Sequence, residues 1–115
     1  MYNDIILKLL SEITDEDYLP DNFNENSKVS SIIAGSDDMN QVVITIAKKR
    51  IYLSVIGSPY LTAMSKWLQK ELIKGCPETL KQKTLSSLIK QFHLPSYRRQ
   101  DGLLILSLIE QIKAP

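Results

Sequence analysis

Two apolar, β-branched runs separated by a short basic turn constrain the fold of this chain more than any other feature. They span residues 42–46 and 51–56, and the turn between them is Lys48-Lys49-Arg50. Runs of Val and Ile joined by a short polar segment are typical of an antiparallel hairpin. In the second run the apolar residues at odd positions share one face, which predicts a sheet that helices cover on one side.

Further elements are expected before and after this hairpin. Residues 2–13 carry apolar side chains at the spacing of one helix face, and 14–27 form a polar, acidic segment that we interpret as an exposed loop. A short strand near 29–33 ends at a turn that begins with Gly35. Strands early and helices late predict an α+β fold with about three antiparallel strands.

Helix signals dominate the second half of the chain. Ser58 followed by Pro59 is an N-cap and first-position pair, and Gly75 is a typical helix end, so 58–74 is expected to form one helix. An interrupted helical segment follows over 77–92. The last helix comes after Pro95 and is apolar on nearly all sides, which predicts deep burial.

Length and composition indicate a single domain over residues 1–115. The chain is 43% hydrophobic and 23% charged, close to the average for globular proteins. A chain of this size can build a core without disulfide or metal support, so no cofactor is required.

Charge and cysteine content narrow the classes of function. The formal net charge is +1, which provides no basic field for nucleic acid, and the longest apolar run, over 103–106, is far too short to span a membrane. A single cysteine excludes a disulfide framework and suits a reducing compartment, so we expect a cytoplasmic protein.

Few residues offer catalytic chemistry. His93 is interpreted as a surface or capping residue and Cys76 as a loop residue, while Asp37 and Asp101 are either metal ligands or turn and first-turn residues. A nucleophile, a base and an orienting group are not evident together, so the chain is not expected to be an enzyme.

An ordered set of short motifs spans nearly the whole chain. The motifs are Tyr2-Asn3-Asp4-Ile5-Ile6-Leu7, Gly35-Ser36-Asp37, Gly57-Ser58, Glu71-Leu72-Ile73-Lys74-Gly75 and Leu94-Pro95-Ser96-Tyr97-Arg98. In this order they resemble the iron–sulfur cluster scaffold family, which comprises IscU, SufU and the N-terminal domain of NifU. The resemblance implies the SufE/NifU fold.

The resemblance also implies where the ligand site would lie. The three family cysteines correspond here to Gly35, Ser58 and Asp101, with Pro59 in place of Ser58 when the helix is counted back from Gly75. Only Asp37 matches a family ligand. Soft thiolates hold iron–sulfur clusters and zinc, so a remnant of Asp37 and Asp101 would bind an iron–sulfur cluster or zinc only weakly.

Residues 95–103 are also similar to the closing motif of the SufE sulfur acceptors. The SufE acceptor cysteine would fall within 28–31, where this chain has none. A SufE-like accessory protein without its acceptor cysteine therefore stays open as an alternative, as does a weak metal-binding scaffold.

As the resemblance implies, we expect a divergent cluster-assembly protein that acts as an adaptor or regulator without binding a cluster. Its implied partners are a cysteine desulfurase or an Hsp70-type chaperone, and no membrane or nucleic acid is expected. The segment Leu94-Pro95-Ser96-Tyr97-Arg98 is the candidate chaperone contact, on the expectation that it is exposed and extended. The alternative is that it only connects two helices. An interaction module unrelated to clusters also stays open.

Overall fold

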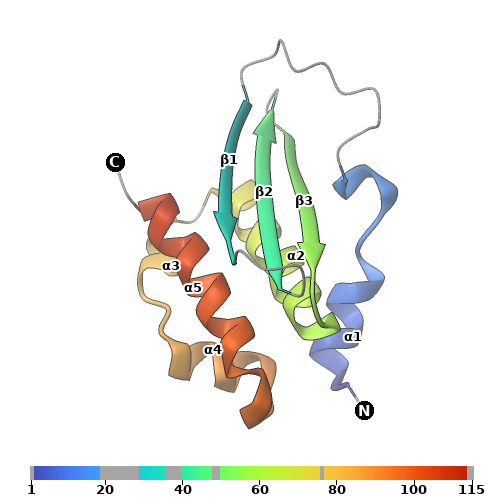
Figure 1. Ribbon diagram of the computed structural model, residues 1–115, viewed down its shortest axis with the longest axis vertical. Coiled ribbons are helices and arrows are strands. Elements are labelled where there is room, and N and C mark those ends of the chain that lie inside the picture. The colour runs from blue at the N-terminus through green and yellow to red at the C-terminus, as the bar shows by residue number, and fades with distance from the viewer. Residues whose placement is uncertain (1, 19–28, 36–39, 48–49, 76, 114–115) are drawn as a thin grey trace.

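A three-stranded antiparallel sheet packed against helices forms the domain (Figure 1). The computed structural model describes residues 2–18, 29–35, 40–47, 50–75 and 77–113. The predicted α+β class is confirmed. No helix in these ranges is both long and apolar enough to cross a bilayer.

The sheet has the order β1-β2-β3. The strands are β1 (Val29–Ala34), β2 (Gln41–Ala47) and β3 (Arg50–Ile56). Ile44 of β2 lies opposite Ile32 on one side and Leu53 on the other, so these three side chains share a face. The β2–β3 pair confirms the predicted hairpin.

The helices surround this sheet on one side and at its edges. They are α1 (Asp4–Ser11), η1 (Asp15–Asp17), α2 (Pro59–Lys74), α3 (Pro77–Lys81), α4 (Leu85–Phe92), η2 (Ser96–Arg98) and α5 (Arg99–Lys113), η denoting a 3-10 helix. In Figure 1, α2 lies behind the sheet and α5 lies beside β1. Helix α1 packs on α2.

Helix α2 begins and ends where its capping residues predict. The Ser58 hydroxyl accepts a hydrogen bond from the Leu61 N–H at 3.2 Å, and Pro59 occupies the first turn. Gly75 ends the helix in the left-handed conformation, with φ +70. The predicted helix is therefore confirmed at both ends.

The core lies between the inner sheet face and the helices. Its fully buried residues include Ile44, Leu61, Met64, Leu68, Phe92, Ile105 and Leu108. The opposite sheet face exposes Ile33 and Ile56. Cover on one side of the sheet, as predicted, follows from the alternation along the strands.

The interruption expected within 77–92 is present, since the segment forms the two helices α3 and α4, with Thr84 as the cap of α4. Two expectations need correction. The last helix is not buried all round, since Leu103 is 44% exposed. The segment interpreted as an exposed acidic loop contains Asp17, which is buried in η1. His93 ends α4 with φ +52 and is exposed, as expected of a capping residue.

Candidate functional site

A hydrogen bond joins the beginnings of helices α2 and α5. The Ser58 hydroxyl donates to Oδ2 of Asp101 at 2.6 Å, although the two residues are 43 positions apart. Both side chains are buried, and Asp101 is only 2% exposed. We call Ser58, Asp101 and the neighbouring Arg98 the Ser58–Asp101 junction.

Helix ends explain why a carboxylate is tolerated in this buried place. Asp101 lies in the first turn of α5, and Ser58 is the N-cap of α2. Unpaired N–H groups and aligned peptide dipoles make a helix N-terminus favourable for negative charge. The junction therefore fastens two helices at the ends where an acidic side chain is stabilised.

Arg98 completes the junction only in part. Its guanidinium lies 4.0 Å from Oδ2 of Asp101, a long distance for an ion pair, and 5.4 Å above the ring of Tyr97. Its Nε atom is buried and has no hydrogen-bond partner among the described residues. Because the Arg98 side chain is 37% exposed, it can meet a further acceptor from outside the fold.

Gly35, the first of the three implied cysteine positions, has no room for a side chain. Its φ is +84, and a Cβ atom there would lie 2.2 Å from the carbonyl oxygen of Asn40. A Cβ at Gly57, beside Ser58, would lie 3.3 Å from Oδ1 of the same Asn40. The end of β1 and the approach to α2 therefore converge on Asn40, in a close packing that requires glycine at position 35.

Of the two metal-site residues expected from the sequence, only Asp101 lies within the described ranges. Asp37 lies outside the described residues, as does Cys76. Asp101 is engaged with Ser58, and the described residues contain no group of three His, Cys, Asp or Glu side chains suited to a metal. The pairing of Asp37 with Asp101 stays a prediction.

The candidate partner segment is neither fully exposed nor extended. Leu94 is buried, with 7% of its surface exposed, and Ser96, Tyr97 and Arg98 form the 3-10 helix η2. Leu94 belongs to the hydrophobic core and lies beside Gly102, where a Cβ atom would be 3.6 Å from Leu94 and only 2.9 Å from Leu85. The expectation of an exposed stretch is wrong for Leu94, and the expectation of an extended stretch is wrong for Ser96, Tyr97 and Arg98. Pro95 is extended, and Tyr97 is 72% exposed.

A pocket of about 470 Å³ opens beside this segment. We call it the aromatic pocket, and its lining residues are Tyr2, Asn3, Tyr60, His93, Pro95 and Tyr97. The rings of Tyr2 and Tyr60 meet edge to face, with centroids 5.0 Å apart. Nδ2 of Asn3 donates to the carbonyl of Phe92 at 2.8 Å, which fixes the start of α1 against the end of α4.

Tyr60 lines the aromatic pocket from the first turn of α2. Burial raises the pKa of its hydroxyl above the ordinary value of 10.0, and the neighbouring Tyr97 and Tyr2 act in the same direction. Arg98 opposes this shift. The Tyr60 hydroxyl therefore stays protonated near neutral pH and available as a hydrogen-bond donor.

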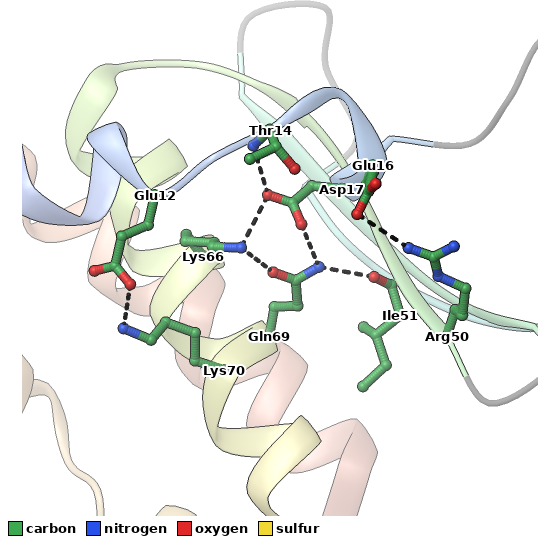
Figure 2. A network of polar contacts seen from close by, with 9 residues as sticks. All are labelled: Glu12, Thr14, Glu16, Asp17, Arg50, Ile51, Lys66, Gln69 and Lys70. Atoms are coloured by element: carbon green, nitrogen blue, oxygen red, sulfur yellow. Dashed lines mark hydrogen bonds and ion pairs between the residues drawn. The ribbon is translucent and has the colours of Figure 1, made fainter.

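A second polar cluster joins η1, α2 and β3, and Figure 2 shows its contacts. Nζ of Lys66 donates to Oδ2 of Asp17 and to Oε1 of Gln69, both at 2.9 Å. Nε2 of Gln69 donates to Oδ1 of Asp17 at 3.1 Å and to the carbonyl of Ile51 at 2.7 Å. We call these residues, with the Thr14 N–H that also bonds Asp17, the Lys66 network.

The Lys66 network keeps Asp17 ionised. Burial alone would raise the pKa of Asp17, but the hydrogen bonds from Lys66, Thr14 and Gln69 outweigh it and hold the pKa below 3.8. Beside the network, the hydrogen bond from Lys70 to Glu12, at 2.6 Å, lowers the pKa of Glu12. The charges of Lys66 and Asp17 are therefore matched within the fold, whereas Oε1 of the neighbouring Glu12 is buried without a hydrogen-bond partner among the described residues.

Sequence reasoning missed the Lys66 network. Lys66 and Gln69 are three positions apart, so they share a face of α2, and they lie within one turn of the apolar stripe at Met64 and Leu68. Long polar side chains beside a core stripe signal a buried polar contact. The partner Asp17 could not be identified, because it lies 49 residues away in a segment typical of a loop.

The fold and its contacts define a small α+β domain with two buried polar junctions and one aromatic pocket. The sequence matches no known family model and no curated protein. We therefore infer its function from the residues themselves.

Proposed function

We propose that this protein is a divergent iron–sulfur cluster assembly protein that acts as an adaptor or regulator and does not itself hold a cluster. One observation carries the proposal. Ser58 and Asp101, which correspond to two family cysteines in the sequence resemblance, share a hydrogen bond of 2.6 Å. Residues 43 positions apart meet at this distance only if the fold brings the two helix starts together.

The chemistry of these positions supports the absence of a cluster. Ser58 presents a hydroxyl and Asp101 a carboxylate, whereas iron–sulfur clusters are held mainly by thiolates. Gly35 leaves no space for a cysteine, because a Cβ would approach the Asn40 carbonyl within 2.2 Å. At the two buried positions a hydrogen bond holds the helix starts together without a metal.

The surface beside the junction supports an adaptor role. Tyr97 and Arg98 lie only a few residues before Asp101, and Tyr60 lies two residues after Ser58. A cysteine desulfurase or an Hsp70-type chaperone is the partner that the resemblance implies. A protein that meets such partners belongs in the cytoplasm, which is part of the proposal.

A reconstitution experiment tests the proposal. The protein is purified anaerobically, incubated with iron, cysteine and a cysteine desulfurase, and assayed for bound iron, zinc and acid-labile sulfide. We expect no stoichiometric metal or sulfide, together with a saturable change in the rate of sulfide release by the desulfurase. Stoichiometric iron and sulfide would overturn the non-binding role, and metal uptake lost on D37A/D101A substitution would identify a weak metal-binding scaffold instead.

A pair of exposed tyrosines provides the matched control for partner contact. Y97A removes a ring beside the junction, and Y18A removes a ring that is 43% exposed outside the aromatic pocket. We expect only Y97A to weaken the effect on the desulfurase or the binding of an Hsp70-type chaperone. If Y97A and Y18A both behave like the wild-type protein with both partners, the adaptor role is contradicted. It is also contradicted if the wild-type protein affects neither the desulfurase nor the chaperone.

A further inference from the structure

The aromatic pocket has the form of a peptide-binding site. Its volume, about 470 Å³, lies within the range usual for ligand sites. Four elements meet around it: the start of α1, the first turn of α2, the end of α4 and η2. The bond from Asn3 to Phe92 and the contact between Tyr2 and Tyr60 hold its walls in place.

The lining residues point to one mode of peptide recognition. Three tyrosines, a histidine and a proline line the pocket, and no Leu, Ile, Val or Phe is among the described lining residues. An amphipathic helix needs aliphatic anchoring sites, and an added strand needs a sheet edge, neither of which is present in this lining. Flat aromatic walls with hydroxyl donors are typical of grooves that bind the polyproline II conformation, whose carbonyls are free to accept hydrogen bonds.

The positive charge of Arg98 beside the aromatic pocket indicates which residues a bound peptide should carry. The guanidinium of Arg98 lies over the ring of Tyr97, which itself lines the pocket. The Asp101 carboxylate lies 4.0 Å from the Arg98 guanidinium, and the Arg98 side chain is 37% exposed. No carboxylate is among the described lining residues, so the pocket favours an acidic group over a cation.

We propose that the aromatic pocket binds a proline-rich peptide in the polyproline II conformation, with an acidic residue next to its prolines. The prolines pack against Tyr60 and Tyr97, and the Tyr60 hydroxyl donates to a peptide carbonyl. The acidic residue pairs with Arg98. This inference deepens the adaptor role and rests on it only for the identity of the protein that carries the peptide.

Fluorescence anisotropy with synthetic peptides tests the inference on the full chain. The probe is a fluorescein-labelled Pro-Pro-Pro-Pro-Asp-Glu peptide, compared with Pro-Pro-Pro-Pro-Lys-Lys and with Gly-Ser-Gly-Ser-Asp-Glu. We expect saturable binding of the first peptide and binding at least roughly tenfold weaker for the other two. Absence of saturable binding, or equal affinity for the three peptides, would overturn the inference.

Variants locate the binding to the pocket. Y97A should weaken binding roughly tenfold, since the ring is 72% exposed and its loss leaves the core intact. Y18A should leave the affinity unchanged. R98Q should abolish the preference for Asp-Glu over Lys-Lys while the preference for proline remains. An equal loss in Y97A and Y18A would place the binding elsewhere and contradict the inference.

A competing ligand and the choice of assay separate the remaining outcomes. Tetramethylammonium, which aromatic cages bind through cation–π contacts, should not displace the peptide. Tight binding of tetramethylammonium would identify a cation cage and overturn the peptide assignment. The peptide assay contains no desulfurase or chaperone, so absence of peptide binding would not contradict the adaptor role. Failure of the reconstitution experiment would likewise not contradict peptide binding.

Discussion

Helix α2 carries two buried polar contacts that differ in how completely their charges are matched. In the Lys66 network, both oxygens of Asp17 accept hydrogen bonds, and the Lys66 ammonium is paired with Asp17 and Gln69. In the Ser58–Asp101 junction, one short bond joins two helices, and Arg98 stays 4.0 Å away with its Nε unpartnered among the described residues.

This difference suits two different roles. A buried network whose charges are matched within the fold stabilises it. The junction lies next to the pocket for which we propose a binding role. The two contacts lie at different positions on one helix, so substitutions can compare them within a single molecule.

The largest expected effect is the loss of the Lys66 ammonium. K66M leaves the Asp17 carboxylate buried beside an apolar side chain, and we expect the free energy of unfolding to fall by about 3 kcal/mol. The Lys66 and Asp17 side chains are only 11% and 10% exposed, so water cannot replace the lost partner. Urea unfolding followed by circular dichroism measures the change.

A surface ion pair on the same side of the molecule is the control for K66M. Arg50 lies 3.6 Å from Glu16, with side chains that are 56% and 80% exposed. R50M should lower the free energy of unfolding by less than about 1 kcal/mol. If both variants lose the same amount, the Lys66 network has no special structural role.

Loss of the Ser58 hydroxyl should have the next largest effect. S58A removes the N-cap of α2 and leaves the buried Asp101 without its short hydrogen bond. We expect the free energy of unfolding to fall by about 2 kcal/mol. Roughly half of this loss comes from the missing cap and half from the unpaired acceptor on Asp101. Thermal and urea unfolding of the same protein give this value.

Thr84 provides a matched cap for the comparison. It caps α4 with the same 3.2 Å bond to a backbone N–H, but its site is exposed and has no carboxylate partner. T84A should therefore lower the free energy of unfolding by about 1 kcal/mol. The difference between S58A and T84A isolates the bond to Asp101, and equal losses would show that this bond contributes nothing.

The fold was predictable where local residue chemistry decides it. The β-branched runs of the hairpin and the caps Ser58 and Gly75 act over a few residues, so the sequence alone predicts β2, β3 and α2. The interruption expected within 77–92 is also present, and the Thr84 cap places the start of α4 at Leu85. The exposed Leu103 shows that apolarity alone does not determine burial, because only part of a helix surface faces its neighbours.

The site was predictable only in part, because its contacts are long-range. Local residue chemistry identified Ser58 as a helix cap and offered a first-turn position for Asp101, whereas the contact between the two is found only in the fold. The position of Lys66 beside the apolar stripe of α2 is a local signal, but nothing local identifies Asp17, 49 residues away, as its partner. The aromatic pocket likewise joins Tyr2, Tyr60 and Tyr97 across most of the chain, and a lone tyrosine in sequence does not indicate which others it will meet.

Acid sensitivity distinguishes the Lys66 network by another route. The pKa of Asp17 is lowered in the folded protein, so its contribution to stability is complete above about pH 5 and is lost as the pH falls through the folded pKa. D17N should flatten the fall in the free energy of unfolding between about pH 5 and pH 2. An unchanged acid limb in D17N, measured by urea unfolding at each pH, would contradict this role; E12Q controls for the neighbouring Lys70 pair.

The smallest expected effect concerns the side-chain hydrogen bonds at the two edges of the sheet. Gln69 of the Lys66 network bonds the Ile51 carbonyl on β3, and Gln111 of α5 bonds β1, with Nε2 donating to the Ile33 carbonyl at 2.7 Å. The Ile33 N–H also donates to Oε1 of Gln111 at 3.4 Å. Because these bonds are exposed, Q111A should lower the free energy of unfolding by less than about 1 kcal/mol. Faster hydrogen exchange of the Ile33 amide would report the opened edge.

Q69A should lower the free energy of unfolding by about 2 kcal/mol, since it leaves buried groups of Asp17 and Lys66 unsatisfied. Equal costs for the two variants would mean that burial does not separate these edge contacts, and the contrast between the Lys66 network and the exposed surface would then fail.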